Sequence, residues 1–318
     1  MGGGAYSAQA HADLLQSRAN RTPEQVFAQT GCHALMNPKG VRVRECRDSA
    51  DHPAALGIVF ALDVTGSMGA IPKMLAAREL PKFMQVLLGS GVVDPQLLFM
   101  AVGDAHFDRA ALQVGQFEST ANLMDEWLTR SFLEGGGGGN GRESYELALY
   151  FLAQHTELDS VVKRKKRGYV FMTGDELPYD TLSKHIVETL IGDALDDDLK
   201  LEEIVAELQK SFVPFFLIPD QARRGRCEGR WREVLGDHVL CMEDAGDVCF
   251  VAAGALLIGE GLVTDEPTLR SALGRGGLAD SRSNAVVTAL RPLLNPARPA
   301  PAPAEPGLVT RFFKAIGV

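Results

Sequence analysis

The sequence lacks any stretch of about 18 consecutive apolar residues, the length that a membrane-spanning helix requires. Its most apolar run, Val248 to Gly259, is too short to span a bilayer. The N-terminal sequence also lacks a charged segment followed by an apolar one, so we expect no secretory signal. These absences favour a cytoplasmic protein.

Cysteine pairs with C-x-x-C spacing are absent as well. The chain has five cysteines, an odd number, and reduced thiols are the expected state in a cytosolic protein. A zinc site is the less favoured alternative, because the spacing of its candidate ligands matches no common zinc pattern. Those ligands are Cys227, Cys241, Cys249 and His238.

Positive charge is in short supply. The chain carries 41 acidic and 32 basic side chains, for a formal net charge of −9. A general nucleic-acid binder needs a basic face to displace counterions, so nucleic acid is not an expected partner. The strongest basic run, Lys163 to Arg167, is either a solvated surface or a patch for an acidic partner or RNA.

Several enzyme motifs are missing. No G-x-S-x-G nucleophile elbow occurs. The stretch Gly136 to Glu143 superficially resembles a phosphate-binding P-loop, but Arg142 stands in place of the lysine. Glu143 stands in place of the hydroxyl residue and would repel phosphate. We therefore do not expect a P-loop ATPase.

What the sequence does contain is an alternation of buried strands and helices from Leu56 onward. A short turn joins the second and third strands, so we expect that pair to be antiparallel. The pattern predicts an α/β fold: an open, mostly parallel, doubly wound sheet with helices on both faces and one antiparallel strand. The expected strands lie at 56–63, 96–104, 110–117, 167–176, 212–220 and 238–243.

Composition divides the chain into three parts. Residues 1–55 are expected to form a helical and extended appendage, and residues 56–262 the α/β domain. Residues 263–318 are expected to be a Pro- and Ala-rich linker that ends in a short apolar, basic segment. That terminal segment either docks on the chain's own surface or binds a partner.

Acidic residues stand at the ends of three predicted strands. Asp63, Asp104 and Asp175 each follow a buried apolar run. The carboxyl ends of parallel strands meet at one edge of a sheet, and function gathers there in open α/β folds. We therefore expect these three carboxylates to lie at the same edge.

The first of these strands leads into the motif D-x-T-x-S, formed by Asp63, Thr65 and Ser67. In an extended backbone these alternating side chains project to one side. One carboxylate and two hydroxyls are hard oxygen ligands, which favour Mg²⁺, or Mn²⁺ or Ca²⁺, over zinc. They leave much of the ion's charge uncancelled, so an outside carboxylate would be attracted.

The stretch "DVTGSM" after a buried strand resembles the metal-ion-dependent adhesion site (MIDAS) of von Willebrand factor A (vWA) domains. The resemblance covers about residues 56–261 and implies the same order of strands and helices. It implies that Asp175, in "YVFMTGDE", supplies the third-loop aspartate. The chain resembles a divergent intracellular, bacterial-type branch associated with AAA+ ATPases or kinases.

The second-loop threonine of that family has no counterpart in "GGGGGNGRESYELAL". Asn140 or Glu143 takes its place under this resemblance, either directly or through water. Asp104 is then an outer member of the site.

The expected function is therefore a non-enzymatic, metal-dependent interaction module that binds an acidic side chain of a protein partner. One alternative is a Mg²⁺-dependent phosphatase or hydrolase that uses the same strand-end carboxylates. Thr65 stands where such enzymes usually carry their second carboxylate, so the proton shuttle is missing. The other alternative is a vWA scaffold with a degenerate metal site, in which the sheet edge, the basic run or the terminal segment binds the partner.

Overall fold

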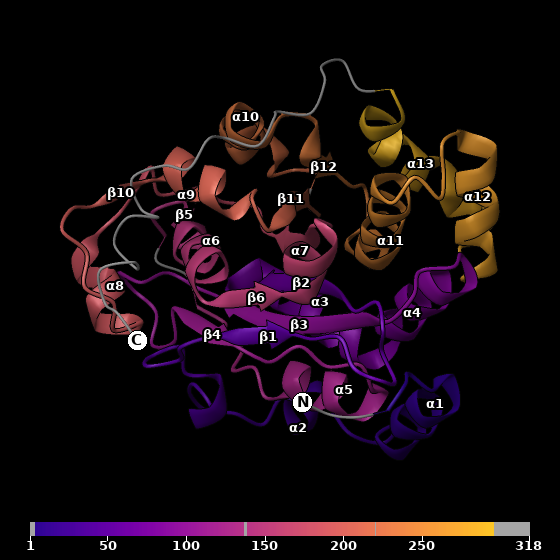
Figure 1. The fold of residues 1–318 in the computed structure, drawn as a ribbon, viewed down its shortest axis with the longest axis horizontal. Coiled ribbons are helices and arrows are strands. Elements are labelled where there is room, and N and C mark those ends of the chain that lie inside the picture. Colours follow the sequence, from indigo (N-terminus) through magenta and orange to yellow (C-terminus); the bar gives the residue numbers. More distant parts are fainter. Residues whose placement is uncertain (1–3, 137–138, 220, 296–318) are drawn as a thin grey trace.

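A sheet of six strands forms the centre of the computed structural model, which describes residues 4–136, 139–219 and 221–295 (Figure 1). Five strands run parallel, and β4 is antiparallel to its neighbour β3. This confirms the predicted α/β class. In order across the sheet, the strands are β12 (Val239–Cys241), β11 (Phe212–Ile218), β7 (Gly168–Thr173), β2 (Leu56–Asp63), β3 (Pro95–Val102) and β4 (Leu112–Val114).

Helices cover both faces of this sheet. Every residue of β2 and β3 is buried, as the uninterrupted apolar runs require. One face packs against α3 (Ala70–Met74), α4 (Leu80–Gly89), α5 (Ala121–Thr129) and α11 (Val248–Gly259). The other packs against α6 (Tyr145–Gln154), α8 (Lys184–Leu190), α9 (Leu201–Leu208) and α10 (Arg224–Leu235).

The helix predicted after β2 is not uniform. A π-helical segment, η3 (Leu75–Glu79), separates α3 from α4. Pro81 has no N–H, and its ring would collide with the carbonyl four residues earlier in a regular α-helix. The wider π turn just before Pro81 accommodates this without ending the helix.

Short elements complete the loops. Within the described ranges, three two-stranded pairs lie outside the main sheet. They are β1 (Arg44–Cys46) with β6 (Thr156–Leu158), β5 (Arg142–Glu143) with β8 (Leu177–Pro178), and β9 (Thr181–Leu182) with β10 (Leu199–Lys200). The remaining helical segments here are η2 (Gly66–Gly69), α7 (Asp159–Arg164), η4 (Gly236–His238) and η5 (Ala245–Asp247).

The predicted appendage is docked on the domain. It contains α1 (Ala8–Ser17), α2 (Pro23–Val26), η1 (Ala34–Met36) and β1. Thr22 caps α2 in a capping box with Gln25. Helix α1 packs against α4 and α5, and Figure 1 shows it at the lower right of the molecule.

The prediction of a linker from residue 263 onward is wrong for residues 266–294. These form α12 (Glu266–Arg275) and α13 (Asp280–Leu294), which pack beside α11 and α4 (Figure 1). Their buried leucines and valines recur at helical spacing. The arginines and serines between them lower the mean hydropathy of the segment, so the sequence alone indicated a polar linker. Residues 296–318, with the rest of the predicted linker and the terminal segment, lie outside the described residues.

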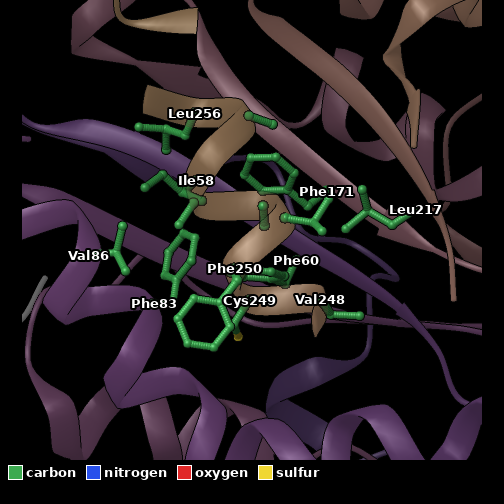
Figure 2. Close-up of a cluster of buried hydrophobic side chains, with 14 of the residues drawn as sticks. Ile58, Phe60, Phe83, Val86, Phe171, Leu217, Val248, Cys249, Phe250 and Leu256 are labelled. Atoms are coloured by element: carbon green, nitrogen blue, oxygen red, sulfur yellow. The ribbon is translucent and has the colours of Figure 1, made fainter. Parts of the chain in front are cut away.

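Helix α11 is the most apolar element. Figure 2 shows its residues Val248 to Leu256 between the sheet residues Phe60 and Phe171 and Phe83 of α4. Ten of its twelve residues are buried, which explains its almost wholly apolar sequence. Among the described residues, no helix combines the length and apolar character needed to cross a membrane.

The docking of α13 is testable through Leu290, which is fully buried. A Cβ added at Gly254 of α11 would lie 2.4 Å from Leu290 Cδ1, so α11 and α13 are in close contact. We expect Leu290→Ala to lower the free energy of unfolding by about 2–5 kcal/mol, as measured by urea denaturation. The control Leu262→Ala, at a side chain 45% exposed, should change it by less than about 0.5 kcal/mol. Equal effects would mean that α13 is not part of the core.

A partly buried ion pair of the domain, His155 with Asp193, also contacts the appendage through the Arg42 carbonyl. His155 Nε2 lies 2.7 Å from Asp193 Oδ2, and His155 Nδ1 lies 3.1 Å from the Arg42 carbonyl oxygen. Burial opposes the charged imidazole, but the hydrogen bond and charge of Asp193 outweigh it and raise the pKa of His155. The pair's contribution is therefore full below the unfolded value of about 6.5 and is lost as pH rises through the folded pKa.

We accordingly expect the stability difference between wild type and His155→Gln to be larger at pH 6 than at pH 8.5. Urea midpoints for both proteins at both pH values measure it. A difference that stays constant or grows with pH would show that the imidazolium form is not the one stabilised.

Candidate functional site

Three loops meet where β7, β2 and β3 end. These strands are neighbours in the sheet and run parallel, so their carboxyl ends share one edge. Asp63 is the last residue of β2, Asp104 follows β3 and Asp175 follows β7. All three are almost fully buried. The structure thus places these three predicted carboxylates at the same edge.

Both carboxylate oxygens of Asp63 accept hydrogen bonds from the chain itself. Oδ1 accepts from the Thr65 hydroxyl at 2.6 Å and from the Thr65 backbone N–H at 2.9 Å. Oδ2 accepts from the Tyr145 hydroxyl at 2.7 Å. Ser67 lies in η2, and the prediction for its hydroxyl falls outside the described part of the chain.

Tyr145 was missed by the sequence analysis. It is the first residue of α6 and is fully buried. Gly174 makes room for it, because a Cβ at Gly174 would lie 2.2 Å from the Tyr145 hydroxyl oxygen. The sequence held one indication of this contact, the glycine directly before Asp175. A glycine allows another side chain to approach the backbone closely.

Asp104 belongs to a second set of contacts at the same edge. Its carboxylate accepts from the Tyr179 hydroxyl at 3.0 Å and from Asn140 Nδ2 at 3.3 Å. The His106 backbone N–H donates to it at 2.9 Å. The Asn140 amide oxygen accepts from the Arg142 N–H at 3.1 Å. Asn140 is therefore tied to Asp104 and its own loop, and no contact joins it to Asp63 among the described residues.

Glu143 sits between the two sets. It is buried, and no described group hydrogen-bonds to its Oε2. Burial raises the pKa of Glu143 to about 9, and the charges of Asp63, Asp108 and Asp104 add to this. Strand β5 carries Glu143 and pairs with β8. This pairing fixes the segment before α6 against the loop that follows β7. Of the two residues proposed to replace the family's threonine, Glu143 is the one coupled to Asp63.

The ionised forms of the carboxyl groups at this edge are disfavoured. Burial raises the pKa of Asp63 to about 7, the hydrogen bonds from Thr65 and Tyr145 oppose the rise, and the charge of Asp175 adds to it. Glu146, the residue after Tyr145 in α6, has its pKa raised to about 8, mainly through burial. Carboxylates in such a setting gain from any nearby cation.

One cation is already built in. Arg223, just before α10, lies with Nη1 2.9 Å from Asp175 Oδ2 and 3.4 Å from Glu176 Oε1. The Arg223 side chain is about one third exposed, whereas that of Asp175 is almost completely buried. The guanidinium therefore covers the Asp175 carboxylate from the solvent side. The sequence analysis did not identify it, because Arg223 is 48 residues away in sequence.

The donor set fits a hard divalent cation by chemistry and charge. Carboxylate and hydroxyl oxygens are present, a bound cation would favour the ionised forms of the carboxyl groups, and Glu143 has an unused oxygen. Within the described residues, however, no group of three or more His, Cys, Asp or Glu side chains is arranged to hold a metal ion. Side chains now bonded to Tyr145 and Arg223 would have to turn toward the ion.

Neither a protein-family model nor a curated protein matches the chain. Similar solved structures include the pilus adhesin SpaC from Lactobacillus rhamnosus GG (9% identity, TM-score 0.42) and a von Willebrand factor type A protein from Catenulispora acidiphila (15%, 0.37). A third is proximal thread matrix protein 1 from the mussel byssus, with a zinc-occupied MIDAS motif (12%, 0.39).

These three alignments cover 71%, 69% and 70% of this chain. They cover only 31%, 46% and 51% of the other chains, so this chain spans about a third to a half of their length. At such low identities and TM-scores, the fold assignment rests on the sheet order and register described above.

The bond between Tyr145 and Asp63 generates a prediction. Tyr145→Phe leaves Asp63 Oδ2 buried without its donor, which should cost about 1–3 kcal/mol of unfolding free energy. A double-mutant cycle with Asp63→Ala isolates the pair, and we expect a coupling energy of about 1 kcal/mol or more from urea denaturation. Additivity within about 0.5 kcal/mol would contradict a direct bond.

Proposed function

We propose that this chain is a vWA-type protein-interaction module whose binding face is the carboxyl-end edge of the sheet. At that edge a divalent cation, Mg²⁺ by the hardness of its ligands, would recruit a carboxylate of a protein partner. The observation that carries the proposal is the burial of three carboxyl groups, those of Asp63, Glu143 and Asp175, at this one edge. Burial raises the pKa of Asp63 and of Glu143, so a bound cation would favour their ionised forms.

Each residue of the cluster has a role in this proposal. Asp63 and Asp175 would supply carboxylate ligands, and Thr65 and Ser67 hydroxyl ligands. Glu143 would take the place of the second-loop threonine, while Asn140 and Asp104 hold that loop in position through their hydrogen bond. A bound divalent ion would supply positive charge and open coordination positions for an outside oxygen.

A protein surface is a suitable partner for this edge because of Phe107. Its side chain is 60% exposed in the loop after β3. The neighbouring ring of His106 packs on Tyr179, with centroids 4.8 Å apart, and Tyr179 binds Asp104. An exposed aromatic anchored beside a charged site is typical of residues that dominate binding at interfaces.

The basic run Lys163 to Arg167 is a weaker candidate for partner binding, since three of its five charges form ion pairs within the chain. Lys163 pairs with Asp159, Arg164 with Asp48 and Lys166 with Glu260. The proposed partner is an intracellular AAA+ ATPase or kinase, and support for that class comes from the sequence resemblance alone. We propose no catalytic role for the chain.

A second candidate function follows from Arg223. If the guanidinium on Asp175 and the Tyr145 hydroxyl on Asp63 are the permanent partners of these carboxylates, the edge needs no metal. The module would then bind its partner through Phe107 and the edge loops, as a vWA-like scaffold without a cation.

Titration of the full chain with MnCl₂ and MgCl₂ tests the proposal. Isothermal calorimetry and Mn²⁺ electron paramagnetic resonance should detect one site, which Asp63→Asn weakens about tenfold or more. Arg223→Gln should bind the ion about tenfold more tightly, because it removes a competing positive charge from Asp175. The matched control Asp51→Asn, at an exposed aspartate, should leave the affinity unchanged.

Acetate then serves as a stand-in for the partner's carboxylate. If acetate lowers the water relaxivity of the bound Mn²⁺, the ion has positions open to an outside oxygen. No ion binding at millimolar concentration by wild type or Arg223→Gln would favour the metal-free scaffold. Phosphatase turnover with Mg²⁺ that disappears in Asp63→Asn would favour the hydrolase over both.

A further inference from the structure

A cavity of about 320 Å³ lies between the appendage and the domain, away from the loops that carry Asp63, Asp104 and Asp175. Its walls come from α1, α2 and the segments α3 and η3. The latter two continue directly from η2, the turn that follows Asp63. Its volume is within the range of small-molecule sites in proteins, about 300–1,000 Å³.

The floor of the cavity is apolar. Leu15, Val26, Phe27 and Ala76 line it, and Phe27 and Ala76 are buried members of the core. An apolar floor alone would favour an uncharged ligand. The charged residues of the lining favour an anionic one.

Three cationic side chains line the cavity, namely Arg18, Arg21 and Lys73, and no acidic side chain does so. Two of them have acidic partners outside the lining: Arg18 pairs with Asp125, and Lys73 lies 3.3 Å from the exposed Glu24. Arg21 has no ion pair among the described residues. The lining is therefore positive in a chain whose net charge is −9.

Arg18 supplies the most specific observation. Its Nη2 donates to Asp125, but Nη1 is buried and has no hydrogen-bond partner in the part of the chain that the structure describes. A buried guanidinium N–H without an acceptor is costly, and the fork geometry of arginine suits a carboxylate or a phosphate. Arg18 thus lines the cavity beside apolar residues and keeps one terminal nitrogen without a partner among the described residues. Nη1 itself is covered, so an anionic head would reach it only if the guanidinium turns toward the cavity.

We propose that this cavity binds a small anionic amphiphile, a carboxylate or phosphate head on a short apolar tail. The head lies at Arg18, Arg21 and Lys73, and the tail lies against Leu15, Val26 and Phe27. The proposal does not depend on the function proposed for the sheet edge, because no residue is shared between the two sites.

Calorimetry of the full chain with octanoate, octyl phosphate, octanol and octylamine tests it. We expect at least one anionic probe to bind about tenfold more tightly than octanol and octylamine. The preferred anion distinguishes a carboxylate site from a phosphate site. Raising the salt concentration should weaken binding of the anion and leave octanol unaffected.

Variants locate the site. The double variant Arg21→Gln/Lys73→Gln should weaken binding of the anion about tenfold. Ala77→Leu should also weaken it, because the larger side chain takes up part of the cavity from an exposed lining position. The matched control Lys39→Gln/Arg42→Gln removes the same charges from exposed positions outside the lining and should change nothing. Thermal melting verifies that each variant is folded. Octylamine binding as tightly as octanoate, no binding of either anion, or full affinity in Ala77→Leu would overturn the proposal.

Discussion

The burial of several carboxylates at the ends of neighbouring parallel strands is the constraint on which the rest of this structure depends. A parallel sheet brings the ends of β7, β2 and β3 together, so Asp63, Asp104 and Asp175 share one edge. Ionised groups removed from water must be hydrogen-bonded or paired, or they take up protons. The loops around the edge provide such partners from the chain itself.

These internal partners explain features that otherwise look unrelated. Tyr145 reaches Asp63 only because Gly174 has no side chain. Tyr145 is also the first residue of α6, so its bond to Asp63 fixes where the segment before α6 ends. The pairing of β5 with β8 holds that segment against the loop that follows β7. Arg223, which directly precedes α10, covers Asp175. The edge is therefore assembled from five separate segments, and Glu143 is the acid at this edge with an oxygen that no described group hydrogen-bonds.

The sheet and its three acidic ends were predictable because each depends on a short local signal, an apolar run followed by an aspartate. Tyr145 and Arg223 were not, since a tyrosine and an arginine in helical sequence look the same whether they face solvent or a buried carboxylate. Asn140 was grouped with Asp63 by its place in the sequence, yet it bonds to Asp104. Helices α12 and α13 were missed because amphipathic helices with several arginines and serines resemble a polar linker.

The internal cation also bears on how a divalent ion and a partner would act together. Arg223 already cancels part of the charge on Asp175, so an ion entering this edge gains only the difference between its own attraction and that of the guanidinium. A guanidinium released from Asp175 would stand at the surface beside the ion, where both would attract an acidic partner. Binding of the ion and of the partner's carboxylate would then favour the same arrangement of Arg223, and the two equilibria would be coupled through this one side chain.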